Sequence, residues 1–242
     1  GIFNVISAAM NQSFFTLSLG IGAMMIFGSY LGNQRNLTGE SLFIVALDTF
    51  VALTSGLIIF PACFAFGVQP DSGPGLVFIT LPNIFNQMSL GSLWGSLFFV
   101  FMSCAALTTV IAVVENIVSY SMDVWGWGRK KSIAVHFVLL ALLMMPCILG
   151  FNKWSGFTPF GPGSGIMDLE DFIISNNMLP LGSLIILLFC TSRYGWGWKN
   201  FLIEADKGEG PKFPRFVRAY LTWVLPFVVL ILFIQGYIDK FF

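Results

Sequence analysis

Long apolar runs separated by short polar segments dominate the pattern of this chain. A helix of about 20 residues crosses the hydrocarbon core of a bilayer, and the pattern predicts six crossings. They cover residues 12–30, 41–68, 91–122, 132–149, 172–191 and 216–238. The apolar part of 69–90 is too short to span and contains Pro82, so we expect an extracellular hairpin there. The pattern therefore predicts an all-α polytopic membrane protein with a single transmembrane domain over residues 1–242.

Composition agrees with this prediction and excludes several classes of function. Hydrophobic residues make up 56% and charged residues 10% of the chain, whereas soluble domains carry about 25% charged residues. The formal net charge of +0 gives no basic surface that would attract a nucleic acid. The spacing of the four cysteines fits neither a metal site nor a disulfide framework. The sequence contains no HExxH or GxSxG motif, and it has a single histidine, so we expect no enzyme.

Basic residues indicate which loops are cytoplasmic. Of the 12 lysines and arginines, all but Lys153 and Lys240 follow the first, third or fifth run or begin the sixth. Because positive residues concentrate on the cytoplasmic side, residues 192–215 are predicted to form a cytoplasmic loop and both chain ends to lie outside. An outside start directly before a crossing fits a fragment that lacks earlier crossings. The sequon at Asn36 would then face the cytoplasm, so we expect no glycan there.

Polar side chains interrupt three of the apolar runs. A carboxylate at membrane depth costs about 2.5–3.5 kcal/mol on insertion scales and usually marks the path of an ion or a substrate. Simpler interpretations exist, because a hydroxyl can bond the carbonyl four residues back, glycines allow close packing of helices, and a carboxylate can be satisfied by packing. The interrupting residues are Thr16, Ser18, Gly20 and Gly22 in the first run, Asp48 in the second, and Thr108, Thr109 and Glu115 in the third.

The first run places its weakest helix formers at its centre, which predicts a helix broken at mid-membrane. A break frees backbone groups and is tolerated only where it lines a cavity or a binding site. Freed carbonyls and hydroxyls suit Na⁺, and freed N–H groups at a helix start suit a carboxylate. With Asp48 supplying a formal charge, the pattern predicts a sodium-coupled carrier of a small zwitterion. The alternative is a channel-like or structural membrane subunit, although no selectivity filter is evident in the sequence.

Ordered motifs along the chain resemble the neurotransmitter:sodium symporter family, in particular its bacterial amino-acid transporters. The stretch "NQSFFTLSLGIGAMMIFGSY" is similar to the family's unwound sixth helix, and "ALDTFVALTSGLIIF" to its seventh. The stretch "GPGLVFITLPNIF" resembles the extracellular hairpin before helix eight, "AALTTVIAVVE" resembles helix eight, and "DLEDFIISNNMLPLG" resembles helix ten. The family fold joins two inverted five-helix repeats. The resemblance therefore implies that this chain holds helices six to eleven, and that the first five helices are its missing partners.

The resemblance also implies roles for individual residues. Phe15 would cap the substrate, and Gln12 matches a glutamine of the family's chloride site. The residues implied to bind substrate are Phe15, Thr16, Ser18, Ile21, Thr109 and Val113. Those implied to hold sodium are Thr16 and Asp48 at one site and Ala105, Thr108 and Thr109 at a second. The implied gate residues are Asp171 on the extracellular side and Ser29, Tyr30, Glu115 and Asp123 on the cytoplasmic side.

Together these features predict Na⁺-coupled symport of a small neutral amino acid across the plasma or inner membrane by alternating access. Ile21 and Val113 are apolar, and no pocket carboxylate is available for a cationic side chain, which favours an apolar or aromatic substrate. Asp48 stands where many members have Asn, and Ala52 offers no hydroxyl for chloride, so we expect transport that is independent of chloride. Membrane lipid is the expected surrounding partner, nucleic acid is not a partner, and the resemblance leaves a homodimer open.

Overall fold

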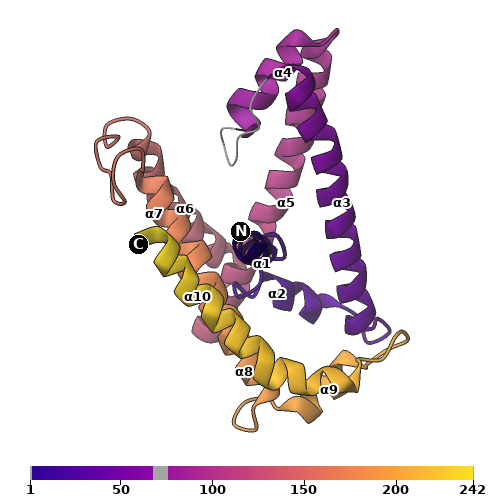
Figure 1. Ribbon diagram of the computed structural model, residues 1–242. Coiled ribbons are helices and arrows are strands. Elements are labelled where there is room, and N and C mark those ends of the chain that lie inside the picture. The colour runs from indigo at the N-terminus through magenta and orange to yellow at the C-terminus, as the bar shows by residue number, and fades with distance from the viewer. Residues whose placement is uncertain (1, 68–75, 242) are drawn as a thin grey trace. The chain divides into compact units, whose positions relative to one another are not determined.

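The computed structural model describes residues 2–67 and 76–241, and this part of the chain is built from helices (Figure 1). It divides into two compact units. The first unit consists of Gly1–Leu42 with Val113–Phe242, and the second of Phe43–Ala112. Helices α3 (Leu37–Ala65) and α5 (Gly91–Trp125) pass from one unit into the other. The prediction of a single transmembrane domain stays a prediction.

Within the described residues, five helical stretches are long and apolar enough to cross a membrane. They are Leu37–Ala65, Gly91–Trp125, Arg129–Gly150, Ile166–Thr191 and Arg215–Ile238. These stretches correspond to the last five predicted crossings, several of which extend further into the flanking polar residues than the apolar pattern indicated. Arg129–Gly150 is helix α6.

The first predicted crossing differs from the other five because it is broken. Helix α1 (Ile2–Thr16) ends in the middle of the predicted crossing, and α2 (Ala23–Tyr30) starts after a gap. The predicted break is therefore confirmed. Helix α1 begins at Ile2, ten residues before the predicted crossing, so it extends beyond the predicted start as several other helices do.

Three π-helical segments each lie directly before a Leu-Pro pair. They are η1 (Leu76–Thr80), η2 (Phe172–Met178) and η4 (Tyr220–Val224), followed by α4 (Leu81–Gln87), α8 (Leu179–Thr191) and α10 (Leu225–Phe241). In each case the second residue of the following helix is the proline. Proline lacks an N–H and its ring collides with the carbonyl four residues back, so a wider preceding turn accommodates it. Helix α7 (Ile166–Asp171) thus continues through η2 into α8, and the short 3₁₀ turn η3 (Arg215–Val217) precedes η4.

Each unit has a small apolar core. In the first unit, Phe14 of α1 packs against Leu179 of α8 and against Val229 and Leu232 of α10, so these three helices share one core. In the second unit, Cys63 of α3 packs against Leu81 and Ile84 of α4. This second core attaches the described part of the predicted 69–90 hairpin to α3. Residues 69–75 of the segment lie outside the described residues, and its extracellular location stays a prediction.

The predicted cytoplasmic loop 192–215 is folded and docked. It contains α9 (Trp198–Ala205), and the side chain of Asn36 donates hydrogen bonds to the carbonyls of Ala205 at 3.2 Å and Lys207 at 3.3 Å. Thr38 Oγ1 donates to the same Ala205 carbonyl at 3.1 Å. Asn36 is only 3% exposed and its Oδ1 accepts from the Gly39 N–H, so this sequon asparagine is committed to the fold.

Candidate functional site

The break between α1 and α2 has the geometry of an unwound binding segment. Ser18 has a φ of 51°, and Gly20 and Gly22 each have a φ of 85°, so these three residues have left-handed backbone conformations. Left-handed backbone is open to glycine but costs a residue with a Cβ about 1–3 kcal/mol when the position is strained. Such conformations cluster where a chain binds ligands. Residues 17–22 therefore interrupt the helix and contain a left-handed serine near their start.

A side chain of α5 holds the break from one side. The Asn116 amide nitrogen donates a hydrogen bond to the carbonyl of Ile21 at 2.9 Å. Val113 lies on the same face of α5, because residues three apart are neighbours on a helix. No role was predicted for Asn116 from the sequence, so its contact with the unwound segment was not expected.

The first four predicted substrate residues lie at or within this break. Phe15 and Thr16 end α1, while Ser18 and Ile21 lie within the unwound segment. The side chains of Phe15 and Ile21 are both exposed rather than packed into a core of the first unit. Val113 lies one helical turn before Asn116, whose amide bonds the Ile21 carbonyl. The binding roles of these residues stay predictions.

The predicted sodium ligands of the second unit include a compact group of oxygens. Thr108 Oγ1 donates to the Ala105 carbonyl at 2.8 Å, and Thr109 Oγ1 donates to the same carbonyl at 3.2 Å. Both threonine hydroxyls therefore bond to the backbone of their own helix, as the simpler interpretation of such residues expects. It does not exclude ligation, because a hydroxyl that donates its proton keeps lone pairs for a cation. Asp48 is half-buried on α3 of the same unit. Hydroxyls, carbonyls and a carboxylate fit a hard cation such as Na⁺.

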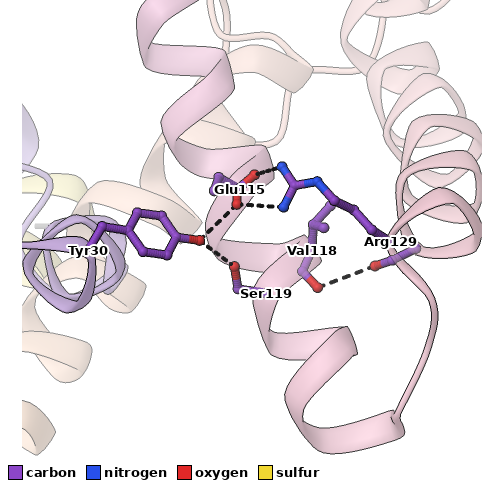
Figure 2. Close-up of polar contacts among 6 residues, drawn as sticks. Tyr30, Glu115, Val118, Ser119 and Arg129 are labelled. Atoms are coloured by element: carbon purple, nitrogen blue, oxygen red, sulfur yellow. Dashed lines mark hydrogen bonds and ion pairs between the residues drawn. The ribbon is translucent and has the colours of Figure 1, made fainter.

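A polar cluster joins α2, α5 and the start of α6 (Figure 2). Tyr30 OH donates to Glu115 Oε1 at 2.8 Å and lies 3.2 Å from Ser119 Oγ. Arg129 donates to both carboxylate oxygens of Glu115, at 2.9 Å and 2.7 Å. The Glu115 side chain is 17% exposed, and it accepts three hydrogen bonds from two different helices. Bidentate pairing of this kind is strong and directional.

The turn between α5 and α6 brings Arg129 to Glu115. The sequence Trp-Gly-Trp-Gly at 125–128 reverses the chain, with Gly126 at a φ of 65°. Ser132 Oγ, one turn into α6, donates to the Val118 carbonyl at 3.3 Å and holds the two helices together. Buried His136 adds contacts to Ser132 and to Ser121 of α5.

The other predicted gate residues do not join this cluster. Ser29 Oγ donates to the carbonyl of Ile26 in its own helix at 2.7 Å. Asp123 is exposed, and within the described part of the chain no hydrogen bond or ion pair links it to Tyr30 or Glu115. Asp171 accepts a hydrogen bond from Ser175 at 2.8 Å, one turn further along.

Arg129 is, like Asn116, a residue of this site that the sequence did not single out. In the sequence it is one of the basic residues that orient the chain. The sequence did contain a signal for an ion pair, since Glu115 precedes and Arg129 follows the short glycine turn. Lys130 and Lys131 follow the same turn, so the sequence offers more than one cationic partner. Only the turn geometry decides which of them reaches Glu115.

Comparison with known proteins identifies the family. The profile of the Sodium:neurotransmitter symporter family matches residues 3–240. This chain belongs to that family. A sodium-dependent transporter of Bacillus subtilis, YhdH, is 34% identical over 229 residues, which is 94% of this chain and 50% of the relative. A sodium-dependent transporter of Haemophilus influenzae is 33% identical over 232 residues, covering 94% and 49%.

A solved structure has a fold similar to that of this chain. The crystal structure of MhsT in complex with L-phenylalanine matches with a TM-score of 0.83 and 38% identity, covering 96% of this chain and 52% of MhsT. The symporter chain thus spans about half the length of the relatives that it matches. Its relatives are transporters rather than enzymes, and the multi-pass membrane location and all-α symporter fold follow from these matches together with the five apolar helices.

Proposed function

We propose that this chain contributes the unwound-helix half of a sodium-coupled symporter for a small neutral amino acid. The observation that carries the proposal is the break at 17–22, with its left-handed Ser18, in a chain of this family. A broken helix is useful in a membrane because it offers backbone groups to a ligand without exposing them to lipid. MhsT, which has the same fold, was solved with L-phenylalanine, and this supports an amino-acid substrate.

The substrate would be held by the break and by apolar side chains. Free N–H groups at the start of a half-helix suit the substrate carboxylate, and Phe15 would close over the site. Ile21 and Val113 would contact the substrate side chain. Because none of the proposed contact residues is charged, a neutral apolar or aromatic side chain is favoured over a cationic one, whose unpaired charge would be expensive at this depth.

Sodium would be bound by carbonyl, hydroxyl and carboxylate oxygens of the residues that the family resemblance implies. Thr16 and Asp48 are proposed for the ion nearest the substrate, and Ala105, Thr108 and Thr109 for the second. The negative charge of Asp48 would offset the ionic charge in a medium of low dielectric. Coupling then follows if sodium and substrate favour the same arrangement of the helices, because each ligand stabilises the state to which the other binds.

Alternating access requires the cytoplasmic path to close and open. The cluster of Tyr30, Glu115 and Arg129 is proposed as the closed form of this gate, because it ties α2 to the hairpin of α5 and α6. Asp171 is proposed for the extracellular gate. The remaining helices of the binding site would come from the part of the transporter that this chain does not contain, and pairing into a homodimer stays a proposal.

The decisive experiment is uptake by the complete transporter in liposomes. An inward sodium gradient should drive accumulation of a neutral amino acid, and competition with the twenty amino acids should rank apolar and aromatic ones highest. Best inhibition by lysine or arginine would refute the pocket assignment. Currents that persist without any substrate accumulation would instead favour the channel-like alternative.

A further inference from the structure

Two glycines bring the unwound segment into direct backbone contact with α8. A Cβ added to Gly182 of α8 would overlap the carbonyl oxygen of Gly20 and lie 2.9 Å from its carbonyl carbon and 3.0 Å from its Cα. A Cβ added to Gly20 would overlap the Leu179 carbonyl and lie 2.8 Å from the Ser183 nitrogen. Favourable carbon contacts lie at about 3.5–4.0 Å. The two backbones therefore touch with no room for a side chain between them.

The surface of α8 at this contact is firmly supported. Leu179 is almost completely buried and packs against Phe14, Val229 and Leu232 in the core of the first unit. The preceding π-helical turn is anchored as well, because Asn177 donates to the Phe172 carbonyl and accepts a hydrogen bond from Tyr237 of α10. A collision at Gly182 would consequently be relieved by movement of the unwound segment rather than of α8.

The unwound segment is held between two helices. On one side the Asn116 amide of α5 donates to the Ile21 carbonyl at 2.9 Å, and on the other side Gly20 rests on Gly182 of α8. These supports lie only one residue apart in the segment, between Ser18 and the start of α2. These two supports fix the positions of the backbone and side chains of residues 17–22.

We propose that Gly182 is a positioning residue of the transport site. By having no side chain, it lets the unwound segment lie against α8, and this places Thr16, Ser18 and Ile21 for substrate and sodium. The inference rests on the proposed function, since it assumes that the segment binds these ligands. Gly182 itself touches neither ligand in this account.

The size of the expected effect follows from the distances. Restoring ordinary contact for a methyl group at 2.9–3.0 Å requires a displacement of about 0.5 Å or more. Binding groups must be held within about 0.5 Å of their productive positions. We therefore expect Gly182→Ala to weaken the affinity for the amino acid about tenfold or more, and to raise the sodium concentration at half-saturation, since misplacement by about 1 Å can cost a hundredfold.

The test measures equilibrium binding by the purified complete transporter. Gly182→Ala is compared with Gly95→Ala on α5, where an added Cβ would make only ordinary contacts of 3.5–3.8 Å with Phe85. The control variant should bind like the unsubstituted protein. Unchanged affinities for amino acid and sodium in folded Gly182→Ala would overturn the proposal, since mere loss of helix packing would lower the melting temperature without selectively weakening these ligands.

A second pair of variants serves if Gly182→Ala does not fold. The Ser183 hydroxyl is buried without a hydrogen-bond partner among the described residues, so Ser183→Ala should leave affinities unchanged. Ser183 Oγ lies 3.0 Å from the place of a Cβ on Gly20, so the extra methyl of Ser183→Thr should crowd the segment and weaken binding several-fold. Equal affinities for these two variants would overturn the proposal.

Hydrogen exchange separates this inference from the proposed function. Amide exchange of residues 17–22 should accelerate in Gly182→Ala or Ser183→Thr relative to α1, and this readout requires no ligand. If the unsubstituted transporter bound no neutral amino acid with sodium, the proposed function would fail, and exchange would still decide whether Gly182 holds the segment. Unchanged exchange at 17–22 would overturn the positioning role.

Discussion

Removing one hydroxyl from the cluster at the cytoplasmic end should shift the conformational equilibrium of the transporter. Tyr30→Phe keeps the ring and deletes the group that donates to Glu115 Oε1 at 2.8 Å. A hydrogen bond to a charged group contributes about 1.5–3 kcal/mol. Tyr30 is 60% exposed, and solvent screening reduces this contribution to about 1 kcal/mol. Because about 1.4 kcal/mol corresponds to a tenfold change, the expected shift is about fivefold.

The sign of this shift follows from the proposed mechanism. Losing the Tyr30 bond destabilises the arrangement in which α2 is tied to α5, which is proposed as the closed form of the cytoplasmic gate. We expect this closed form to be the one that binds sodium from outside, because an open cytoplasmic gate would release the ion. Less of the sodium-binding form is then populated, so the sodium concentration at half-saturation of substrate binding should rise by up to about fivefold. Maximal binding at saturating sodium should stay the same.

Equilibrium binding of a radiolabelled amino acid over a range of sodium concentrations measures this effect. Tyr120→Phe is a matched control, because Tyr120 lies on the same end of α5, packs edge-on against Trp125 and makes no hydrogen bond within the described residues. Its sodium dependence should equal that of the unsubstituted transporter. Indistinguishable sodium curves for the two variants would refute a gating role of the Tyr30 hydroxyl.

Three further predictions concern sodium ligation, charge and loop docking. Thr108→Val should raise the sodium concentration needed for uptake several-fold. The control Ser103→Ala removes a similar backbone-bonded hydroxyl of α5 and should leave the sodium dependence unchanged. Equal sodium dependence of the two variants would show that Thr108 does not bind sodium. Uptake should persist when gluconate replaces chloride, and Asp48→Asn should weaken sodium binding severely; loss of uptake in gluconate would contradict the role of Asp48. Asn36→Ala deletes the three hydrogen bonds of a buried side chain, and it should lower the unfolding free energy by about 2–4 kcal/mol. Thermal unfolding in detergent and proteolysis of 192–215 measure this loss, and Thr38→Val, which removes one hydrogen bond, should cost less. Equal protease resistance of the Asn36 variant would show that the docking contributes little.

The sequence predicted those features that depend on local chemistry. The break was predictable because serine and glycine weaken a helix where lipid would otherwise demand one, and the long apolar runs indicated the other crossings. The start of α1 at Ile2 was not predicted, because the polar pair Asn11 and Gln12 interrupts the apolar residues within this helix.

The missed parts of the site depend on contacts between distant residues. Arg129 reaches Glu115 because a glycine turn reverses the chain, and neighbouring lysines have the same charge in the sequence. Gly182 looks like any small residue of an apolar helix until the backbone of Gly20 is seen against it. Asn36 had the pattern of a glycosylation site, yet its amide is consumed by the docked loop.

The π-helical turn before Pro180 also affects how this helix can change over evolution. Its bond from the Leu179 N–H to the Ile174 carbonyl spans five residues instead of four, so the turn holds one residue more than an α-helical turn. Deleting a single residue within 172–178 would convert this wide turn into an ordinary α-helical turn and leave the residues after it close to their present orientation. The cost would fall on Pro180, whose ring would then meet the carbonyl four residues back. Deleting a residue between Pro180 and Gly182 would instead rotate Gly182 by about 100° away from the unwound segment. Single-residue deletions should therefore be better tolerated within this turn than in the first turn of α8.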